Sequence, residues 1–267
     1  IRLSLVGSEM CIRDRFRTGN KSCGGRTGLS NLQATGRLTV GVVGAGPVGV
    51  VLGKALASAG HVITGIASSD DKNRERAEAL LPEVEFRSVP ELIAESDLVL
   101  FAIPAEELEK TISGISEAGL FRSGQLIAHT AGEFGYEVLS PAVEQGVIPL
   151  AIHPAMSFTG TSLDLTKIRE SYFAVSAPTV ALPIAQALAI EMGAEPIVIS
   201  EANRKIYFEA ISVANNFSKM IVNQSIGLLE SVGVDNARVV LGPLIRSAVE
   251  EALAEGHIPL DPEELLN

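Results

Sequence analysis

The sequence predicts an α/β fold in which a doubly wound, mostly parallel sheet is followed by a smaller all-α domain. Short apolar runs alternate with helical stretches across residues 38–200, and a glycine-rich turn joins the first run to the first helix. Residues 201–231 then contain no proline and a single glycine, Gly227, as a long helix would. Alternating strands and helices are typical of a parallel sheet covered on both faces. We therefore expect the α/β domain at 38–200 and the helical domain at 201–267.

The first strand and helix enclose the glycine-rich turn. Val40, Val42 and Val43 form a β-branched run typical of a buried strand, and an apolar helix follows the turn as far as Gly60. This order of strand, turn and helix is the dinucleotide-binding fingerprint, in which free backbone N–H groups and the helix dipole bind a pyrophosphate. The predicted cofactor-binding residues of the turn are Gly44, Ala45, Gly46, Pro47, Val48 and Gly49.

The next strand, expected at 61–67, ends in Ser68 and Ser69, where an NAD site usually has an acidic residue for the ribose 2′-hydroxyl. Two hydroxyls followed by Arg74 fit a 2′-phosphate, so the sequence favours NADP(H). Two aspartates, at 70 and 71, stand nearby and keep NAD as an alternative. Arg74 facing solvent is an equally good interpretation.

The remaining α/β elements follow in order. Expected strands are 84–87, 97–104, 125–128, 147–152, 172–176 and 195–199, and expected helices are 72–81, 90–95, 106–117, 135–145 and 180–192. Ligands of such sheets bind beyond the carboxyl ends of the strands, so Pro104, at the end of strand 97–104, is a further cofactor-contacting candidate.

Two histidines follow neighbouring predicted strands on the same edge, His129 and His153. A carbonyl or imine that accepts a hydride needs a proton donor or a hydrogen-bond donor, and histidine supplies either near neutral pH. Both are therefore catalytic candidates. A structural role, with each ring bonded to nearby backbone, is the alternative.

Three polar residues are candidates for contact with substrate. Ser157 follows His153 in a loop, and Asn215 and Asn216 interrupt an apolar helix. A buried amide needs hydrogen-bond partners, so one asparagine is expected in a cleft between the domains. A turn-forming hydroxyl and a helix–helix hydrogen bond are the respective alternatives.

The helix expected at 201–231 carries apolar residues on more than one face. Such a helix must be buried on several sides. Either it forms the core of the small helical domain, or it packs on a second subunit. A second helix is expected from about residue 237 to 255.

Composition excludes several classes of function. The formal net charge is −11, and the basic residues are concentrated in 1–37, so the acidic body is a poor partner for nucleic acids or anionic membranes. No run approaches the roughly 18 apolar residues of a membrane span. Both cysteines, Cys11 and Cys23, lie outside the α/β region, which excludes a disulfide framework there and makes the cytosol the expected compartment. No metal-binding pattern such as HExxH is present, so we expect no metal.

Residues 1–37 lack a hydrophobic period and are rich in small polar residues, so we expect a disordered tail. Leu5–Arg15, which reads LVGSEMCIRDR, also resembles the translation of a sequencing adapter. We assign this segment no functional role.

Five motifs together carry a family resemblance: VGVVGAGPVG, SDLVLFAIP, HTAG, LAIHPAMSFTG and RKIYFEAISVANN, at 40–49, 96–104, 129–132, 150–160 and 204–216. With these the chain resembles bacterial Rossmann-like proteins that carry a carboxy-terminal domain of unknown function, number 2520. They belong to the wider group of pyrroline-5-carboxylate reductases, ketopantoate reductases and 3-hydroxyacid dehydrogenases. The resemblance implies an NAD(P)-binding oxidoreductase that forms a homodimer through its helical domain and acts on a small molecule. It implies no particular substrate.

The sequence departs from the wider group at two places. Ketopantoate reductases and 3-hydroxyacid dehydrogenases have a lysine four residues before an asparagine, whereas here Ile211 precedes Asn215 and Ser212 precedes Asn216. The segment 257–267 also differs from the family pattern, and we expect a truncated carboxy terminus. The missing lysine keeps a second hypothesis open, a non-catalytic sensor or scaffold that binds NADP(H).

Overall fold

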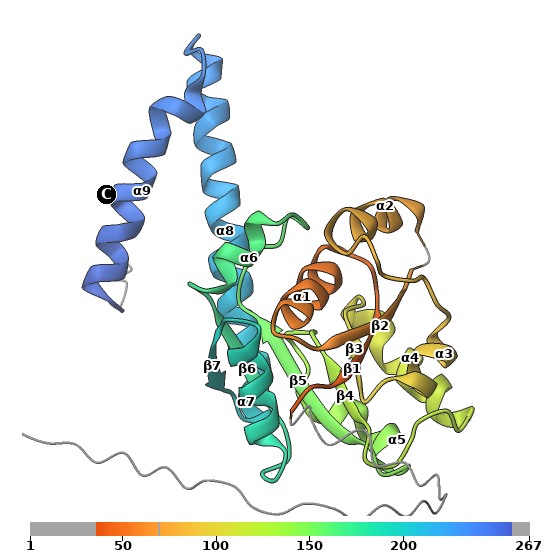
Figure 1. Cartoon of the computed structure of the whole chain (residues 1–267). Helices are drawn as coiled ribbons and strands as arrows, with labels where there is room; N and C mark the ends of the chain where they lie inside the picture. The colour runs from red at the N-terminus through yellow and green to blue at the C-terminus, as the bar shows by residue number, and fades with distance from the viewer. Residues whose placement is uncertain (1–35, 69, 258–267) are drawn as a thin grey trace, which may run out of the picture. The chain divides into compact units, whose positions relative to one another are not determined.

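The computed structural model describes residues 36–68 and 70–257 (Figure 1). In this part of the chain seven strands form one sheet in the order β2-β1-β3-β4-β5-β6-β7. The strands are β1 (Thr39–Val43), β2 (Val62–Ala67), β3 (Leu98–Phe101), β4 (Leu126–His129), β5 (Ile148–Pro154), β6 (Tyr172–Ser176) and β7 (Glu195–Val198). Neighbouring strands are parallel except β5 and β6, which are antiparallel. The strand order reverses beside β1, which is where sheets of this kind bind ligands.

The helices connect these strands and then extend beyond them. They are α1 (Pro47–Ser58), α2 (Asp71–Leu80), α3 (Val89–Glu95), α4 (Ala105–Glu117), α5 (Ser140–Val143), α6 (Leu163–Ile168), α7 (Leu182–Glu191), α8 (Arg204–Ser231) and α9 (Ala237–Glu255). Two short 3-10 turns, Tyr136–Leu139 and Glu201–Asn203, precede α5 and α8.

Helices cover both faces of the sheet, as the alternation of buried residues along β3 shows. Leu98 and Leu100 belong to a core shared with α1 and α7, whereas Val99 and Phe101 belong to a second core shared with α3 and α4. Successive side chains of a strand point to opposite faces, so one strand supplies both cores. The predicted doubly wound sheet is confirmed.

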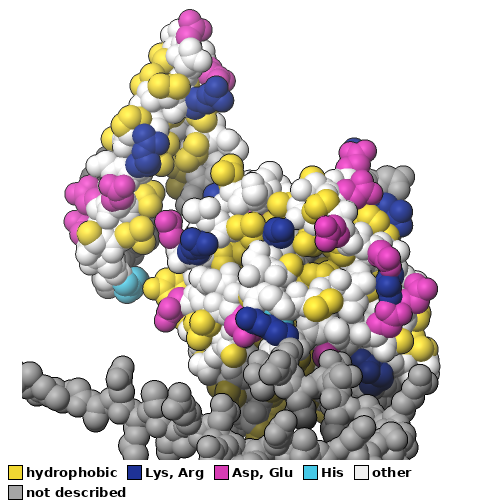
Figure 2. Space-filling model, viewed as in Figure 1, with side chains coloured by type: hydrophobic (Ala, Val, Ile, Leu, Met, Phe, Trp, Pro, Cys, Tyr) yellow, Lys and Arg dark blue, Asp and Glu magenta, His cyan; other side chains and the backbone are white. Residues whose placement is uncertain are grey.

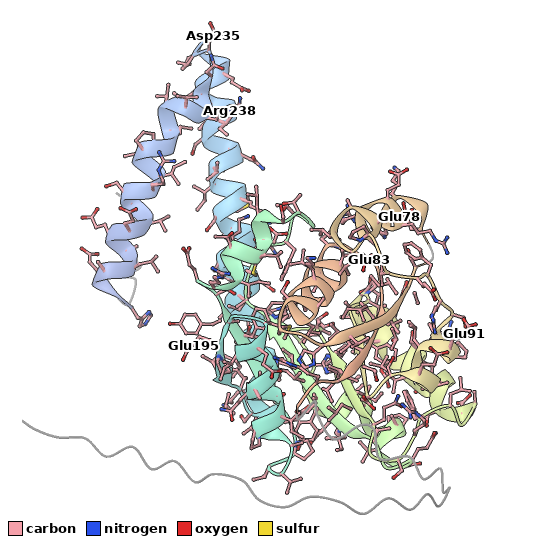
Figure 3. The ribbon with its side chains drawn as sticks, viewed as in Figure 1. Glu78, Glu83, Glu91, Glu195, Asp235 and Arg238 are labelled. Carbon is pink, nitrogen blue, oxygen red and sulfur yellow. The ribbon has the colours of Figure 1, made fainter. Side chains whose placement is uncertain are left out.

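Local hydrogen bonds set the starts of two helices near the glycine-rich turn. At α3, Ser88 and Glu91 form a capping box, and Glu91 lies at the start of this helix (Figure 3). Hydrogen bonds from the Ser88 hydroxyl and backbone hold the pKa of Glu91 below its usual value. At α2, the Asp70 carboxylate accepts a hydrogen bond from the backbone N–H of Lys72 at 3.0 Å.

Three expectations for the α/β region are wrong in detail. Segment 84–87 pairs with β2 through one bridge, Ile66 with Phe86, because the chain turns into α3 almost at once. The helix expected at 135–145 is a 3-10 turn followed by α5, since Pro141 lacks the N–H that would continue a helix across this point. Helix α6 was not expected, and it is only six residues long.

Helices α8 and α9 form an antiparallel pair whose apolar side chains are largely exposed (Figure 2). Asp235 and Arg238 lie at the turn between them (Figure 3), where Asn236 adopts a positive φ of 56° that asparagine tolerates. Within α8, Arg204 alone is buried. The exposed apolar residues of α8 are Ile206, Val213, Phe217, Met220, Ile221 and Leu228, and those of α9 are Val239, Val240, Leu244, Val249 and Leu253.

This exposure argues against one of the two interpretations of the long helix. Among the described residues α8 does not form the core of a helical domain, so that interpretation is wrong. Contact with a second subunit stays a prediction. No helix in residues 36–68 and 70–257 is long and apolar enough to cross a membrane.

Candidate functional site

The glycine-rich turn leaves β1 and enters α1 along a path that requires glycine at two positions. Gly44 has a φ of +108°, and a Cβ there would overlap the carbonyl oxygen of Ala102. A Cβ on Gly49 would overlap the carbonyl oxygen of Gly44. The turn, the end of β3 and the start of α1 are therefore packed backbone to backbone, as the fingerprint predicts.

Gly46 differs from these two because a Cβ there would meet no atom within 4 Å. It precedes α1, and the first helical hydrogen bond runs from Val50 N to Gly46 O at 3.1 Å. The backbone N–H groups of Val48 and Gly49 therefore have no partner within the helix. Open space next to free N–H groups at a helix N-terminus is a site suited to an anion.

A cavity of about 860 Å³ lies over this turn. It is bounded by the turn and by the carboxyl ends of β1, β2, β3 and β4. Predicted residues that line it are Gly44, Ala45, Gly46, Pro47, Val48, Ser68 and Pro104. Thr130, which directly follows β4, also lines the cavity, at the end nearest to β5, the strand that contains His153. The volume lies in the usual range for cofactor sites. The residues fit a dinucleotide: free N–H groups for phosphate and an elongated, partly apolar wall.

The opposite end of the cavity follows β2. Ser69 lies outside the described residues. Arg74 does not line the cavity, and its guanidinium lies 4.6 Å from the centre of the Phe86 ring. Asn73 and Arg87 line the cavity instead, and the sequence analysis missed both. Arg87 forms ion pairs with Glu85 and Glu95. In the sequence it stands in a short charged segment that resembles a strand, and such a segment gives no sign of a binding residue.

His129 is 0% exposed. Its Nε2 donates to the carbonyl oxygen of Gly135 at 2.8 Å, and its Nδ1 is buried without a partner. Burial lowers the pKa of His129 to about 4, so the ring is neutral. This position indicates that the ring holds the loop after β4, which is the structural alternative, and it gives the ring no access to the cavity.

His153 occupies a more open position near the end of β5. Its Nδ1 lies 2.8 Å from the hydroxyl of Tyr207, and a Cβ on Gly132 would lie 2.8 Å from its Nε2. Burial, and then the charge of Arg204, lower the pKa of His153 to about 4. Thr130, which lines the cavity, is two residues from Gly132. The structure thus brings His153 beside the loop that closes this end of the cavity.

Three residues at the start of α8 surround His153 and were missed as site residues. Tyr207 and Phe208 contact its ring edge to face, with ring centres 5.6 and 6.2 Å apart. Arg204 is 1% exposed and donates to Ser176 Oγ, to Ala174 O and, at 3.4 Å, to Ala151 O. All three lie within the motif RKIYFEAISVANN, but a charged residue at a helix start usually indicates solvent exposure.

The predicted substrate residues also meet. Ser157 Oγ donates to Asn215 Oδ1 at 3.2 Å, and Asn215 Nδ2 donates to Asn216 Oδ1 at 3.2 Å. All three side chains belong to exposed residues. In order along α8, Arg204, Tyr207 and Asn215 contact Ala151, His153 and Ser157. No group of three or more potential metal ligands occurs among the described residues.

Family models match two consecutive parts of the chain. Residues 25–154 match a Rossmann-like domain, and residues 171–259 match a domain of unknown function, DUF2520. Strands β6 and β7 lie within the second match although they belong to the same sheet as β1–β5. No curated protein matches the chain.

Several solved structures are similar over most of the chain. A proposed NADP oxidoreductase from Bacteroides fragilis is 20% identical, with 80% of each chain covered and a TM-score of 0.67. A 1-pyrroline-5-carboxylate reductase from Streptococcus pyogenes is 15% identical, with 86% of this chain and 84% of that chain covered and a TM-score of 0.61. A pyrroline carboxylate reductase from Plasmodium falciparum with NADP bound is 14% identical, with 86% and 82% covered and a TM-score of 0.58.

At these identities the likeness concerns the fold, and the fold and the two family matches agree. The chain thus resembles proteins in which a Rossmann-like domain is followed by a DUF2520 domain.

Proposed function

We propose that the protein is an NADP(H)-dependent oxidoreductase that transfers a hydride to or from a small carbonyl, imine or hydroxy-acid substrate. The observation that carries this proposal is the cavity over the glycine-rich turn, with open space at Gly46 and free N–H groups at Val48 and Gly49. These groups would hold the pyrophosphate. The nicotinamide ring, when bound, supplies or accepts the hydride. The similar Bacteroides and Plasmodium proteins, described as an NADP oxidoreductase and an NADP-bound reductase, support the assignment.

The preference for NADP(H) is supported at the end of β2. Ser68 lines the cavity there, whereas the Asp70 carboxylate is used to cap α2. Asp70 does not line the cavity, so its charge, which would repel a 2′-phosphate, lies outside it. Arg74 is held over Phe86 and does not line the cavity, so the proposed cation for that phosphate is Arg87, which does.

We assign the substrate to the space beside His153. The Nε2 of His153 would donate to the substrate oxygen or nitrogen, and the absence of a side chain on Gly132 allows the ring to pack closely against the loop that follows β4. Ser157, Asn215 and Asn216 would orient the substrate. His129, which is fully buried, would support the loop rather than contact substrate.

The variant Gly46→Ala tests cofactor binding without disturbing the fold. Gly46 has a φ of −64° and open space around it, so alanine fits the backbone but its methyl group enters the proposed pyrophosphate site. We expect the Kd for NADPH, measured by fluorescence titration, to rise at least about tenfold, or about 1.4 kcal/mol. The melting temperature without cofactor should not change.

A matched control is Gly114→Ala in α4, where a Cβ also meets no atom within 4 Å. This variant should bind NADPH as the wild type does. Equal NADPH affinity in wild type and Gly46→Ala would contradict the proposed position of the pyrophosphate.

Turnover separates this proposal from a second candidate, a non-catalytic protein that binds NADP(H) as a sensor or scaffold. The absence of lysine at positions 211 and 212 favours the second candidate. We expect loss of NADPH absorbance with at least one member of a panel of small carbonyl compounds and imines. His153→Gln should slow that reaction about 10²–10⁴-fold and leave NADPH affinity unchanged. Tight NADPH binding without turnover of any panel member would favour the sensor.

We also propose that the protein forms a homodimer through α8 and α9. Successive exposed apolar residues of α8 are seven, four, three, one and seven positions apart, so at about 100° per residue they form a single stripe along the helix. An apolar stripe in water is unfavourable, and a second copy with the same stripe would bury it by a two-fold arrangement.

A further inference from the structure

Tyr207 is the one residue of the described chain that hydrogen-bonds the ring of His153. It lies in the first turn of α8, and its hydroxyl is 2.8 Å from Nδ1. The two rings meet edge to face, with an interplanar angle of 81°. A hydrogen bond of this length and a packed ring edge fix both the position and the rotation of the imidazole.

The direction of this hydrogen bond follows from the chemistry of the partners. Burial raises the pKa of Tyr207 to about 12, so the phenol keeps its hydrogen, and the low pKa of His153 leaves the imidazole neutral. A neutral imidazole carries one N–H, on either nitrogen. A phenol is a stronger donor than a neutral imidazole N–H, and an imidazole nitrogen is a stronger acceptor than a phenol oxygen. The favoured arrangement is therefore O–H of Tyr207 donating to Nδ1.

The other nitrogen of the ring is accessible. Within the described residues, Nε2 of His153 has no hydrogen-bond partner. Among the described residues, the fully buried side-chain nitrogens without a hydrogen-bond partner are His129 Nδ1 and Arg204 Nη1, so Nε2 of His153 is not fully buried. The nitrogen that Tyr207 leaves protonated is thus the one that lies over Gly132, beside the proposed substrate space.

Burial keeps the ring neutral, and the charge of Arg204 adds to this effect. The Arg204 guanidinium is anchored to Ser176 and to backbone carbonyl oxygens of β5 and β6, and it lies 5.9 Å from the Tyr207 ring. A fixed cation near the imidazole disfavours a second positive charge on His153. The charged and titratable groups around the ring are therefore Arg204, Tyr207 and the neutral His129, and none of them carries a negative charge.

We propose that Tyr207 is a positioning residue that holds His153 in the tautomer with the proton on Nε2, so that a neutral imidazole presents an N–H donor to the substrate. This rests on the proposed role of His153 and gives it a specific form. Such a donor stabilises negative charge that develops on a carbonyl oxygen or imine nitrogen. It selects substrates with an acceptor atom at the reacting centre.

The tautomer is measurable without substrate or turnover. In the full chain labelled with ¹⁵N-histidine, long-range ¹H–¹⁵N correlation spectra at pH 7 distinguish the two tautomers, and the spectrum of His153→Gln identifies the His153 signals. We expect Nε2 to carry the proton and the Nδ1 resonance to have the shift of a hydrogen-bonded acceptor. In Tyr207→Phe, Nδ1 should move to the shift of an acceptor without a hydrogen bond.

Phe208→Leu is the matched control, because Phe208 contacts the same ring but has no polar group. It should leave the Nδ1 shift unchanged. A wild-type ring protonated on Nδ1 would overturn the proposal, as would a Tyr207→Phe spectrum identical to that of the wild type. These results are independent of the turnover assay, so the tautomer proposal can fail while the oxidoreductase proposal stands, and the reverse.

Discussion

At the scale of single residues, His129 and His153 show how position separates two side chains of the same type. Both lie at the carboxyl ends of adjacent parallel strands, and both have a pKa near 4 mainly because of burial. His129 is closed in on every side and bonded to Gly135, whereas His153 has a nitrogen next to a glycine and a cavity-lining loop. The sequence could place both at the correct edge but could not distinguish them.

The neutral, buried His129 has a consequence for stability. Its pKa is about 4 in the folded chain and near 6.5 when unfolded, so the unfolded state binds the proton first as the pH falls. The free energy of unfolding should therefore decrease between about pH 6.5 and pH 4, by about 3 kcal/mol from this group. Urea denaturation of wild type and His129→Gln at pH 7, 5 and 4 measures it, and the variant should lose less stability across this range.

An equal loss in both proteins would show that His129 does not contribute. Asp97 offers an internal comparison, because hydrogen bonds from the backbone and hydroxyl of Thr39 lower its pKa. The stability that Asp97 contributes is present at pH values above the ordinary pKa of a carboxyl group. It is lost at more acidic pH, below the pH range in which His129 acts.

The residues that could be predicted are those whose roles follow from local sequence. The glycines of the turn are an example, since the positive φ of Gly44 and the contact of Gly49 with Gly44 arise within a single strand–turn–helix unit. Arg204 and Tyr207 act through partners 28 to 54 positions away in the sequence. A single sequence gives no sign of such pairs, and a charged or aromatic residue at a helix start has many other uses.

At the scale of elements, α8 is where the sequence pattern and the structure differ most. Its apolar content predicted burial on several sides. In the described chain α8 contacts α9 and, through Arg204, Tyr207 and Asn215, parts of β5, β6 and the loop after β5, and these contacts leave most of its large apolar side chains exposed. The expected strand 84–87 and the expected helix 135–145 were wrong for another reason. Each has a composition that suits the expected element, but α3 starts directly after the first segment and Pro141 interrupts the second.

The proposed dimer is tested on the stripe of α8. Phe217 lies in the stripe and is 54% exposed. Because the ring is already about half buried, burying the rest of it against a second copy would contribute about half of the roughly 1.5–3 kcal/mol of a fully exposed side chain, and Phe217→Asp replaces that gain with a charge that resists burial. We expect wild type to sediment as a dimer and Phe217→Asp to raise the dimer Kd at least tenfold.

The control is Asn223→Asp, which adds the same charge to an exposed position of α8 outside the stripe. It should remain dimeric in analytical ultracentrifugation. A wild-type protein that is monomeric at high concentration, or equal dissociation of both variants, would contradict an interface on this stripe.

At the scale of the whole molecule, the sheet was predictable because its strands are strongly apolar and its helices are well separated. The reversal at β6 was not, since β6 has the same composition as the parallel strands and the direction of a strand depends on the connection before it. That connection contains α6, which the sequence pattern did not predict.

The reversal at β6 determines how the site is assembled. Because β6 and β7 run against β5, the chain leaves β7 in the direction of the amino end of β5, and α8 then passes alongside β5 in the direction of that strand. One straight helix thus contacts Ala151, His153 and Ser157 in sequence order. Inserting one residue between Tyr207 and Asn215 would turn the later contact by about 100° around the helix axis. Evolution can therefore vary the composition of this stretch more freely than its length, and in related chains gaps should fall before Arg204 or after Asn216.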